Sequence, residues 1–187
     1  MYHFYQILLI STFLPFSWLT FMIVHEFGHV SAAWLTGGHV EYVVLHPLSI
    51  SMTVLSENPH PQLVAWGGPI IGSILPLLAY VMARLIRSPG LYLFRYFCGF
   101  CLVANGLYIL VDGFTLSGDG MTLLNSGASR WQLILFGLIA TPIGFWCWHG
   151  EGRHFGFGTA NGIVQRTAAI ISAFLFFLVL IIEFTLN

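Results

Sequence analysis

Long apolar runs, separated by short polar or glycine-rich breaks, dominate the chain. Five of these runs are long enough to cross a bilayer, which takes about 20 residues of α-helix. Pro15 lacks a backbone N–H, so we expect it to kink or interrupt the first helix. The pattern predicts an α-helical integral membrane protein with about five transmembrane helices. They are expected at residues 4–35, 61–87, 91–111, 131–148 and 167–186.

Residues 39–56 follow a different pattern, in which apolar and polar side chains alternate from Val40 to Val54. A period of two is typical of β-strands, and His46-Pro47 between the two halves is a turn signal. We therefore predict a small β-hairpin between the first two helices, with an ordinary loop as the alternative. An open strand edge is costly in lipid, so the hairpin should face a cavity, protein or water.

The remaining segments are predicted to be connections. Residues 112–120 form a glycine-rich passage with two acids, which we expect to be irregular and to lead into a short helical stretch at 121–124. Residues 149–166 contain five glycines and are expected to form a loop. No separate soluble domain fits into these connections, so residues 1–187 are predicted to form a single membrane-embedded domain.

The composition supports a multi-pass membrane protein. Of the 187 residues, 57% are hydrophobic and only 7% are charged, whereas a soluble domain carries about 25% charged residues. The partner that this composition implies is the lipid bilayer. A formal net charge of −1 gives no indication of a nucleic-acid partner. Cys98, Cys101 and Cys147 lie within apolar runs and are interpreted as packing residues, although the first two have CxxC spacing.

The distribution of arginine predicts an orientation. With five spans, the N-terminus, the 84–95 turn and the 149–166 loop share one side and hold five of the six cationic residues, while Arg130 lies on the other side. The positive-inside rule then predicts a cytoplasmic N-terminus. The hairpin and the C-terminal end of the first helix would lie away from the cytoplasm.

The strongest chemical signal is Val24-His25-Glu26-Phe27-Gly28-His29-Val30 in the first helix. His25 and His29 are four residues apart, so both imidazoles lie on one helix face and can bind one metal ion. Glu26 is beside them, where it can accept a proton from a water molecule bound to that metal ion. An acid at the centre of a membrane helix costs about 3 kcal/mol, and such residues are usually functional. The alternative is a chance match, with all three satisfied by neighbouring helices.

A catalytic zinc ion usually has three protein ligands, so a third must come from elsewhere. Asp112 and Asp119 are expected on the same side of the membrane as the end of the first helix, and a carboxylate is the favoured ligand. Asn105 is a polar residue deep in an apolar run. The further candidates are the histidines at positions 39, 46, 60, 149 and 154.

These motifs occur in an order that resembles the site-2 protease family of intramembrane zinc metalloproteases. The likeness is closest to the compact members without a PDZ domain, and it covers most of residues 16–148. Its elements are the His-Glu-Phe-Gly-His motif, the Gly-Gly turn and β segment, Trp66-Gly67-Gly68-Pro69, Asn105, and the Asp119-Gly120 pair followed by Met121-Thr122-Leu123-Leu124.

The resemblance implies His25, His29 and Asp119 as ligands of one zinc ion and Glu26 as the general base. It implies that Asn105 binds substrate or orients the site, and Asp112-Gly113 is a rival for the third ligand. Two departures stand out: position 72 is Gly where the family usually has Asn, and the spacing between Asn105 and the Asp-Gly pair is longer. The family typically holds its zinc nearer the cytoplasmic face, which is opposite to the orientation that the arginines predict.

The function predicted is an intramembrane zinc endopeptidase that cleaves transmembrane segments of membrane-protein substrates. The substrate helix would have to unwind, and its exposed backbone could pair with the 40–55 hairpin. Regulation would come from a membrane partner, from the substrate or from short loops. The alternatives are a non-catalytic membrane scaffold or substrate-holding protein of the same fold, and a metal transporter. Glu26 favours the enzyme, because a pure ligand site needs no acid between its histidines.

Overall fold

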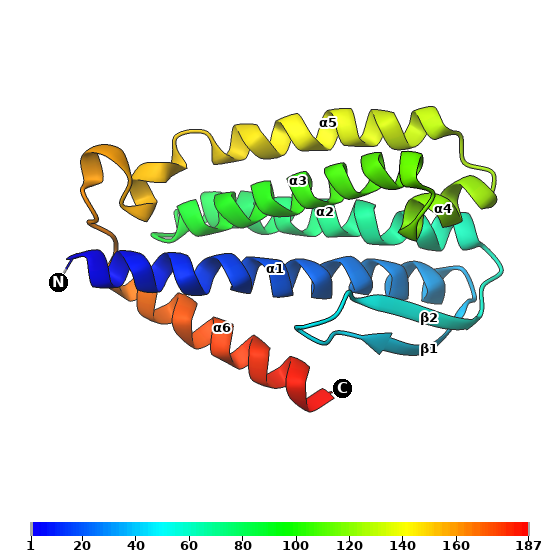
Figure 1. Ribbon diagram of the computed structural model, residues 1–187, viewed down its shortest axis with the longest axis horizontal. Coiled ribbons are helices and arrows are strands. Elements are labelled where there is room, and N and C mark those ends of the chain that lie inside the picture. Colours follow the sequence, from blue (N-terminus) through cyan, green and yellow to red (C-terminus); the bar gives the residue numbers. More distant parts are fainter. Residues whose placement is uncertain (1, 187) are drawn as a thin grey trace.

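The computed structural model describes residues 2–186 and is mostly helical (Figure 1). Five of its helices are long and apolar enough to cross a membrane, which confirms the prediction of a multi-pass integral membrane protein. The elements are α1 (Tyr2–Leu35), β1 (His39–Val44), β2 (Met52–Glu57), α2 (Pro61–Leu85), α3 (Leu91–Thr115), α4 (Gly118–Asn125), α5 (Arg130–Trp148), the short 3-10 helices η1 (Glu151–Phe155) and η2 (Gly158–Ala160), and α6 (Arg166–Leu186).

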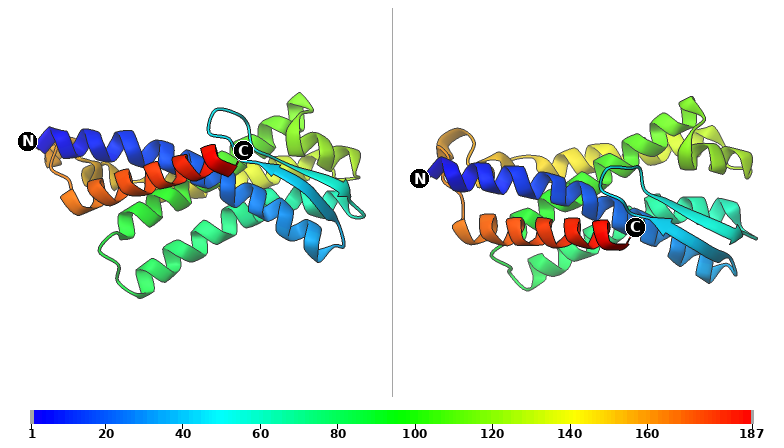
Figure 2. Two further views of the ribbon diagram at one scale, coloured as in Figure 1. Left: turned by 90° about the horizontal axis from the view of Figure 1, so that it is seen from below. Right: turned by 60° about the horizontal axis from the view of Figure 1, so that its bottom comes forward.

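The long helices form a bundle in which α2 packs between α1 and α3, and α5 packs on α3 (Figure 1). Helix α6 packs against α1. The end of α6 meets the hairpin turn, where the rings of His46 and Phe184 are 5.1 Å apart between centroids (Figure 2). One apolar cluster, around Leu9 and Phe13, joins α1 to α3, η1 and α6, while another, around Ile109 and Leu123, joins α2, α3, α4 and α5.

Small residues let α1 and α2 approach closely. A Cβ atom on Gly67 would lie 2.5 Å from the carbonyl oxygen of Gly28 and 2.6 Å from Cβ of Ala32. A side chain at position 67 could therefore be accommodated only if the two helices moved apart. These two glycines therefore determine how near α2 comes to the His-Glu-Phe-Gly-His segment.

The predicted β-hairpin is confirmed. Strands β1 and β2 pair antiparallel, with Val43 opposite Thr53, and the ladder is irregular nearer His39. The turn begins at the expected place, because the Ser49 N–H donates to the carbonyl of His46 at 3.1 Å. The hairpin lies alongside the C-terminal half of α1 (Figure 1) and lines a cavity there, as the cost of an open strand edge requires.

Several predicted boundaries are wrong. Helix α1 is continuous through Pro15, so the proline does not interrupt the helix, and the kink stays a prediction. Helix α3 continues to Thr115 and α4 already begins at Gly118, so the irregular passage expected at 112–120 shrinks to two residues. Helix α3 is capped at its C-terminal end by Leu116, which takes a left-handed conformation and donates its N–H to the Asp112 carbonyl. The 149–166 loop contains η1 and η2, and α2 ends two residues before Arg87.

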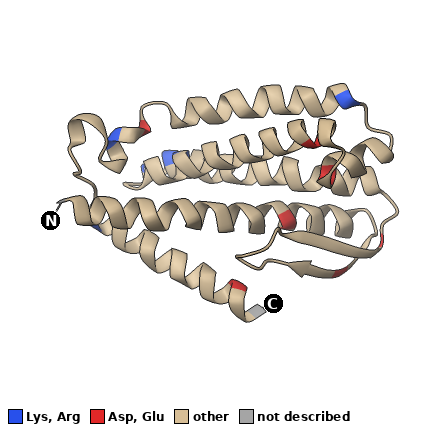
Figure 3. Cartoon of the chain, viewed as in Figure 1, with Lys and Arg blue, Asp and Glu red and all other residues tan. Residues whose placement is uncertain are grey.

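The basic residues lie at the two ends of the molecule, as the five-span interpretation predicts. Basic residues gather at the end of the molecule where α1 begins, and one more lies at the start of α5 at the opposite end (Figure 3). The N-terminus and the α2–α3 turn share the first of these ends (Figure 1). Which end faces the cytoplasm stays a prediction from the positive-inside rule.

Candidate metal centre

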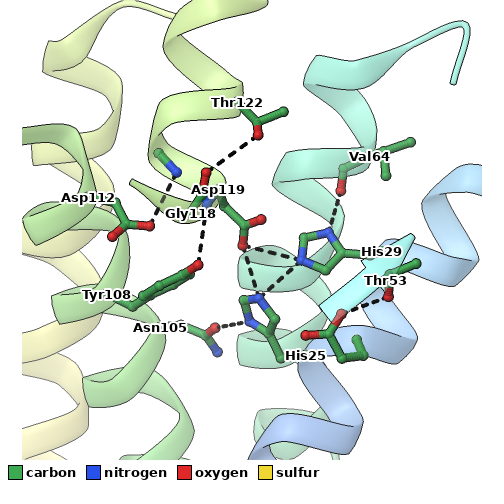
Figure 4. Close-up of polar contacts among 12 residues, drawn as sticks. His25, His29, Thr53, Val64, Asn105, Tyr108, Asp112, Gly118, Asp119 and Thr122 are labelled. Carbon is green, nitrogen blue, oxygen red and sulfur yellow. Dashed lines mark hydrogen bonds and ion pairs between the residues drawn. The ribbon is translucent and has the colours of Figure 1, made fainter. Parts of the chain in front are cut away.

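Three side chains that are distant in the sequence converge beside α2. His25 and His29 project from one face of α1, and Asp119 reaches them from the first turn of α4 (Figure 4). Asp119 Oδ2 lies 3.0 Å from His25 Nε2 and 3.2 Å from His29 Nε2, and the two Nε2 atoms are 3.1 Å apart. Both histidines are only 6% exposed. Within residues 2–186, this is the one group of three that could hold a metal ion.

Each imidazole is oriented through its other ring nitrogen. His29 Nδ1 lies 2.8 Å from the carbonyl oxygen of Val64, which can only accept, so Nδ1 carries the hydrogen. His25 Nδ1 lies 2.8 Å from Asn105 Oδ1, where the same tautomer completes the hydrogen bond. Both Nε2 atoms therefore present lone pairs toward Asp119. This is the arrangement that partners of metal-binding histidines commonly impose.

The donor set fits a metal ion. Two lone pairs and a carboxylate oxygen face one another, so either a proton or a cation must lie among them to offset their repulsion. Ligands of a tetrahedral zinc ion, at about 2.0–2.1 Å from the metal, lie roughly 3.3 Å apart, close to the separations found here. The absence of a side chain on Gly68 also leaves room, because a Cβ atom there would lie 2.8 Å from His25 Nε2 and even nearer His29 Nε2.

Asp119 is held in the ionised form that a metal ligand needs. Burial of its carboxyl group favours the neutral form, but its contacts with the Nε2 atoms of His25 and His29 act in the opposite direction whenever a proton, in place of a metal ion, lies between them. The net effect is a pKa of Asp119 below its usual range. Its backbone N–H donates to the Tyr108 hydroxyl at 3.3 Å, which attaches the start of α4 to α3.

Asp112, the rival third ligand, lies outside the group. It is buried, and it accepts hydrogen bonds from Ser117 Oγ at 2.9 Å and from the Gly120 N–H at 3.4 Å. Its carboxylate therefore closes the turn between α3 and α4 (Figure 4). None of the five further candidate histidines belongs to the three-residue group either.

Asn105 is fully buried and its Oδ1 contacts His25 Nδ1, in agreement with a role in orienting that imidazole. The departure at position 72 has a physical explanation. A Cβ atom on Gly72 would lie 2.9 Å from Asn105 Nδ2. The space beside Gly72 is thus already occupied by the amide that reaches over from α3.

Glu26 lines the same cavity as the three converging side chains. The cavity has a volume of about 290 Å³, and residues 50–53 of the hairpin form one of its walls. Glu26 is 3% exposed, and its Oε2 accepts a hydrogen bond from Thr53 Oγ1 at 2.7 Å. A carboxylate oriented from β2 therefore stands beside the candidate metal position.

Sequence reasoning did not single out three neighbours of the centre. Thr53 was one of several polar residues in an alternating strand, and nothing distinguished it from Ser49 or Ser51. Tyr108 follows Asn105 by three residues on α3 and could have been suggested by that spacing alone. Val64 contributes a backbone carbonyl, for which a sequence carries no signal.

Two histidines and one carboxylate form the ligand set of known metallopeptidases, and here the set is embedded among membrane-spanning helices. The fold and the site thus define a membrane protein of the metalloprotease type. The chain belongs to the Peptidase M50B-like family, whose model matches residues 3–128. This agrees with the resemblance to compact site-2 proteases. No curated protein and no solved structure gave a significant match.

Proposed function

We propose that the protein is an intramembrane zinc endopeptidase that cleaves transmembrane segments of membrane-protein substrates. The observation that carries the proposal is the convergence of His25, His29 and Asp119 at a cavity that also contains Glu26. A scaffold would need neither the preset tautomers nor an acid beside them. Membership of a peptidase family supports the same reaction class.

The residues divide the chemistry among them. A zinc ion held by His25, His29 and Asp119 would supply a Lewis acid that polarises the peptide carbonyl and acidifies the attacking water. Glu26 accepts the proton that this water gives up as its oxygen bonds to the carbonyl carbon. Glu26 then returns the proton to the amide nitrogen as the C–N bond breaks. Thr53 keeps the carboxylate of Glu26 in one orientation through the 2.7 Å hydrogen bond.

The hairpin provides a way to present an unwound substrate. Helical hydrogen bonds shield peptide carbonyls, so a transmembrane substrate has to open locally, and its freed backbone groups need partners. Strand addition to a free hairpin edge would supply them, and residues 50–53 already line the cavity. Replacing Ser49–Thr53 with a flexible polar linker should therefore abolish cleavage, and unchanged cleavage would refute this part of the proposal.

Glu26→Gln tests the reaction directly. The variant keeps the size of the side chain and can still contact Thr53, but it cannot accept the proton. We expect zinc to remain bound while cleavage of a co-expressed membrane substrate falls at least a hundredfold, in line with the usual contribution of a general base.

Glu41→Gln is the matched control, because Glu41 is an exposed carboxylate on β1. It should cleave like the wild type. If the Glu26 variant cleaved equally well, the peptidase mechanism would be wrong. If the wild type bound zinc but cleaved no membrane substrate, a non-catalytic, substrate-holding role would replace it.

A further inference from the structure

A second polar cavity lies at the opposite end of the helices from the metal centre. It has a volume of about 520 Å³, is open to the outside, and is lined by the C-terminal end of α2, the first turns of α3, the end of α5 and η1. These elements meet at the end of the bundle where α1 begins (Figure 1). No residue of the candidate metal centre lines it.

Cationic side chains border this cavity. Arg95 is engaged in the fold, because it pairs with Glu151 and donates to the carbonyls of Trp146 and His149 at 3.2 Å each. Arg84 and Arg153 also line the cavity. Neither has an ion-pair partner among residues 2–186, so two guanidinium groups remain available to an anion.

Two buried polar atoms on the cavity wall lack hydrogen-bond partners within the described part of the chain. The Tyr92 hydroxyl belongs to a residue that is 6% exposed, and its ring is stacked against the ring of His154. Glu151 is 5% exposed, and its Oε2 accepts no hydrogen bond, with His154 Nε2 as far as 4.0 Å away. Buried polar groups are nearly always paired. A ligand that accepts a hydrogen bond from the Tyr92 hydroxyl and donates one to Glu151 Oε2 would therefore satisfy both groups.

The position of the cavity indicates a lipid. Tyr80 and Trp146 line it, and aromatic residues of this kind are enriched at the membrane–water interface. Large apolar side chains near the same ends of α2 and α5 are exposed, as expected where acyl chains surround a protein, among them Met82, Leu85 and Phe145. Basic pockets between membrane helices are known binding places for phospholipid headgroups.

We propose that this cavity binds the headgroup of an ethanolamine phospholipid. The phosphate diester accepts hydrogen bonds from Arg84, Arg153 and the Tyr92 hydroxyl, and guanidinium groups suit phosphate oxygens well. The primary ammonium group, two carbons away from the phosphate, donates to Glu151 Oε2. A choline headgroup has no N–H to donate, and a glycerol headgroup has no cation. The Oε2 atom of Glu151, which the ion pair with Arg95 leaves without a hydrogen bond, and the two unpaired guanidinium groups thus select a zwitterion with a primary amine.

Native mass spectrometry of the purified full-length protein tests the proposal. The protein is delipidated in detergent and titrated with phosphatidylethanolamine, phosphatidylcholine or phosphatidylglycerol of identical acyl chains. We expect the ethanolamine lipid to bind at least tenfold more tightly than either of the others. Equal binding of the choline lipid would overturn the proposal, because the ammonium group would then not be recognised.

The double variant Arg84→Gln with Arg153→Gln should reduce ethanolamine-lipid binding at least tenfold. Arg87→Gln is the matched control, since Arg87 is exposed at the same end but does not line the cavity. Circular dichroism checks that each variant keeps its helices. Equal loss in the control would show that only the general positive charge attracts lipid, and no loss in the double variant would place the lipid elsewhere. Either result would contradict the proposal that the lipid headgroup binds in this cavity.

A last arm distinguishes a lipid from a soluble ligand with the same headgroup. Glycerophosphoethanolamine, which lacks acyl chains, should displace the lipid only at a concentration at least a hundredfold higher. If it binds as tightly as the lipid, the cavity recognises a soluble phosphodiester and the lipid assignment is wrong.

Discussion

Replacing Asn105 with Ala should weaken zinc binding without removing any ligand. Asn105 Oδ1 accepts the hydrogen bond from His25 Nδ1 at 2.8 Å, and the residue is fully buried. The Ala variant leaves that N–H buried and unpaired, at a cost of about 1–3 kcal/mol. This corresponds to roughly 5- to 150-fold in affinity. Loss of a partner that orients a metal-binding histidine typically costs about 10- to 100-fold, so we expect a decrease within that range.

The measurement is zinc competition against a chelator of known affinity, with thermal unfolding of the metal-free protein as a check on the fold. Asn105→Asp is the matched variant, because it retains an acceptor for His25. Asn105 Nδ2 makes no hydrogen bond among the described residues, so this exchange sacrifices none. The Asp variant should bind zinc at least as tightly as the wild type. Wild-type affinity in the Ala variant would refute the orienting role of Asn105.

Three more outcomes follow from the geometry. Asp119→Ala should lose bound zinc in elemental analysis, whereas Asp112→Ala should retain it and unfold more easily, by about 1–3 kcal/mol; the reverse result would make Asp112 the ligand. Gly68→Ala should bind little zinc, because its Cβ occupies the place beside the imidazoles, while Gly90→Ala, whose Cβ would make only ordinary contacts at 3.9 Å or more, should bind normally. Thr53→Val should retain zinc but cleave roughly tenfold more slowly, as expected for a lost hydrogen bond to a carboxylate, and Thr53→Ser should restore the rate.

Local patterns were sufficient for most of the architecture. Lengths of apolar sequence gave the five spans, and the period of two gave the hairpin with its turn at His46-Pro47. Helix ends were less accurate. Asp112 was expected in an irregular passage, but α3 carries on past it because the left-handed residue that ends the helix is Leu116, where no glycine or proline marks the stop.

The pairing of His25 with His29 was determined by the sequence alone, because two residues four apart on any α-helix share a face. The choice between Asp112 and Asp119 was not, since both acids precede a glycine and both were expected at the same membrane side. Only the tertiary structure decided which carboxylate reaches the imidazoles: α4 packs against α2 and α3 with Asp119 toward α1. Likewise, Thr53 meets Glu26 only because the hairpin folds back along α1. Contacts between elements depend on how the chain closes in space, and a local pattern holds no information about that closure.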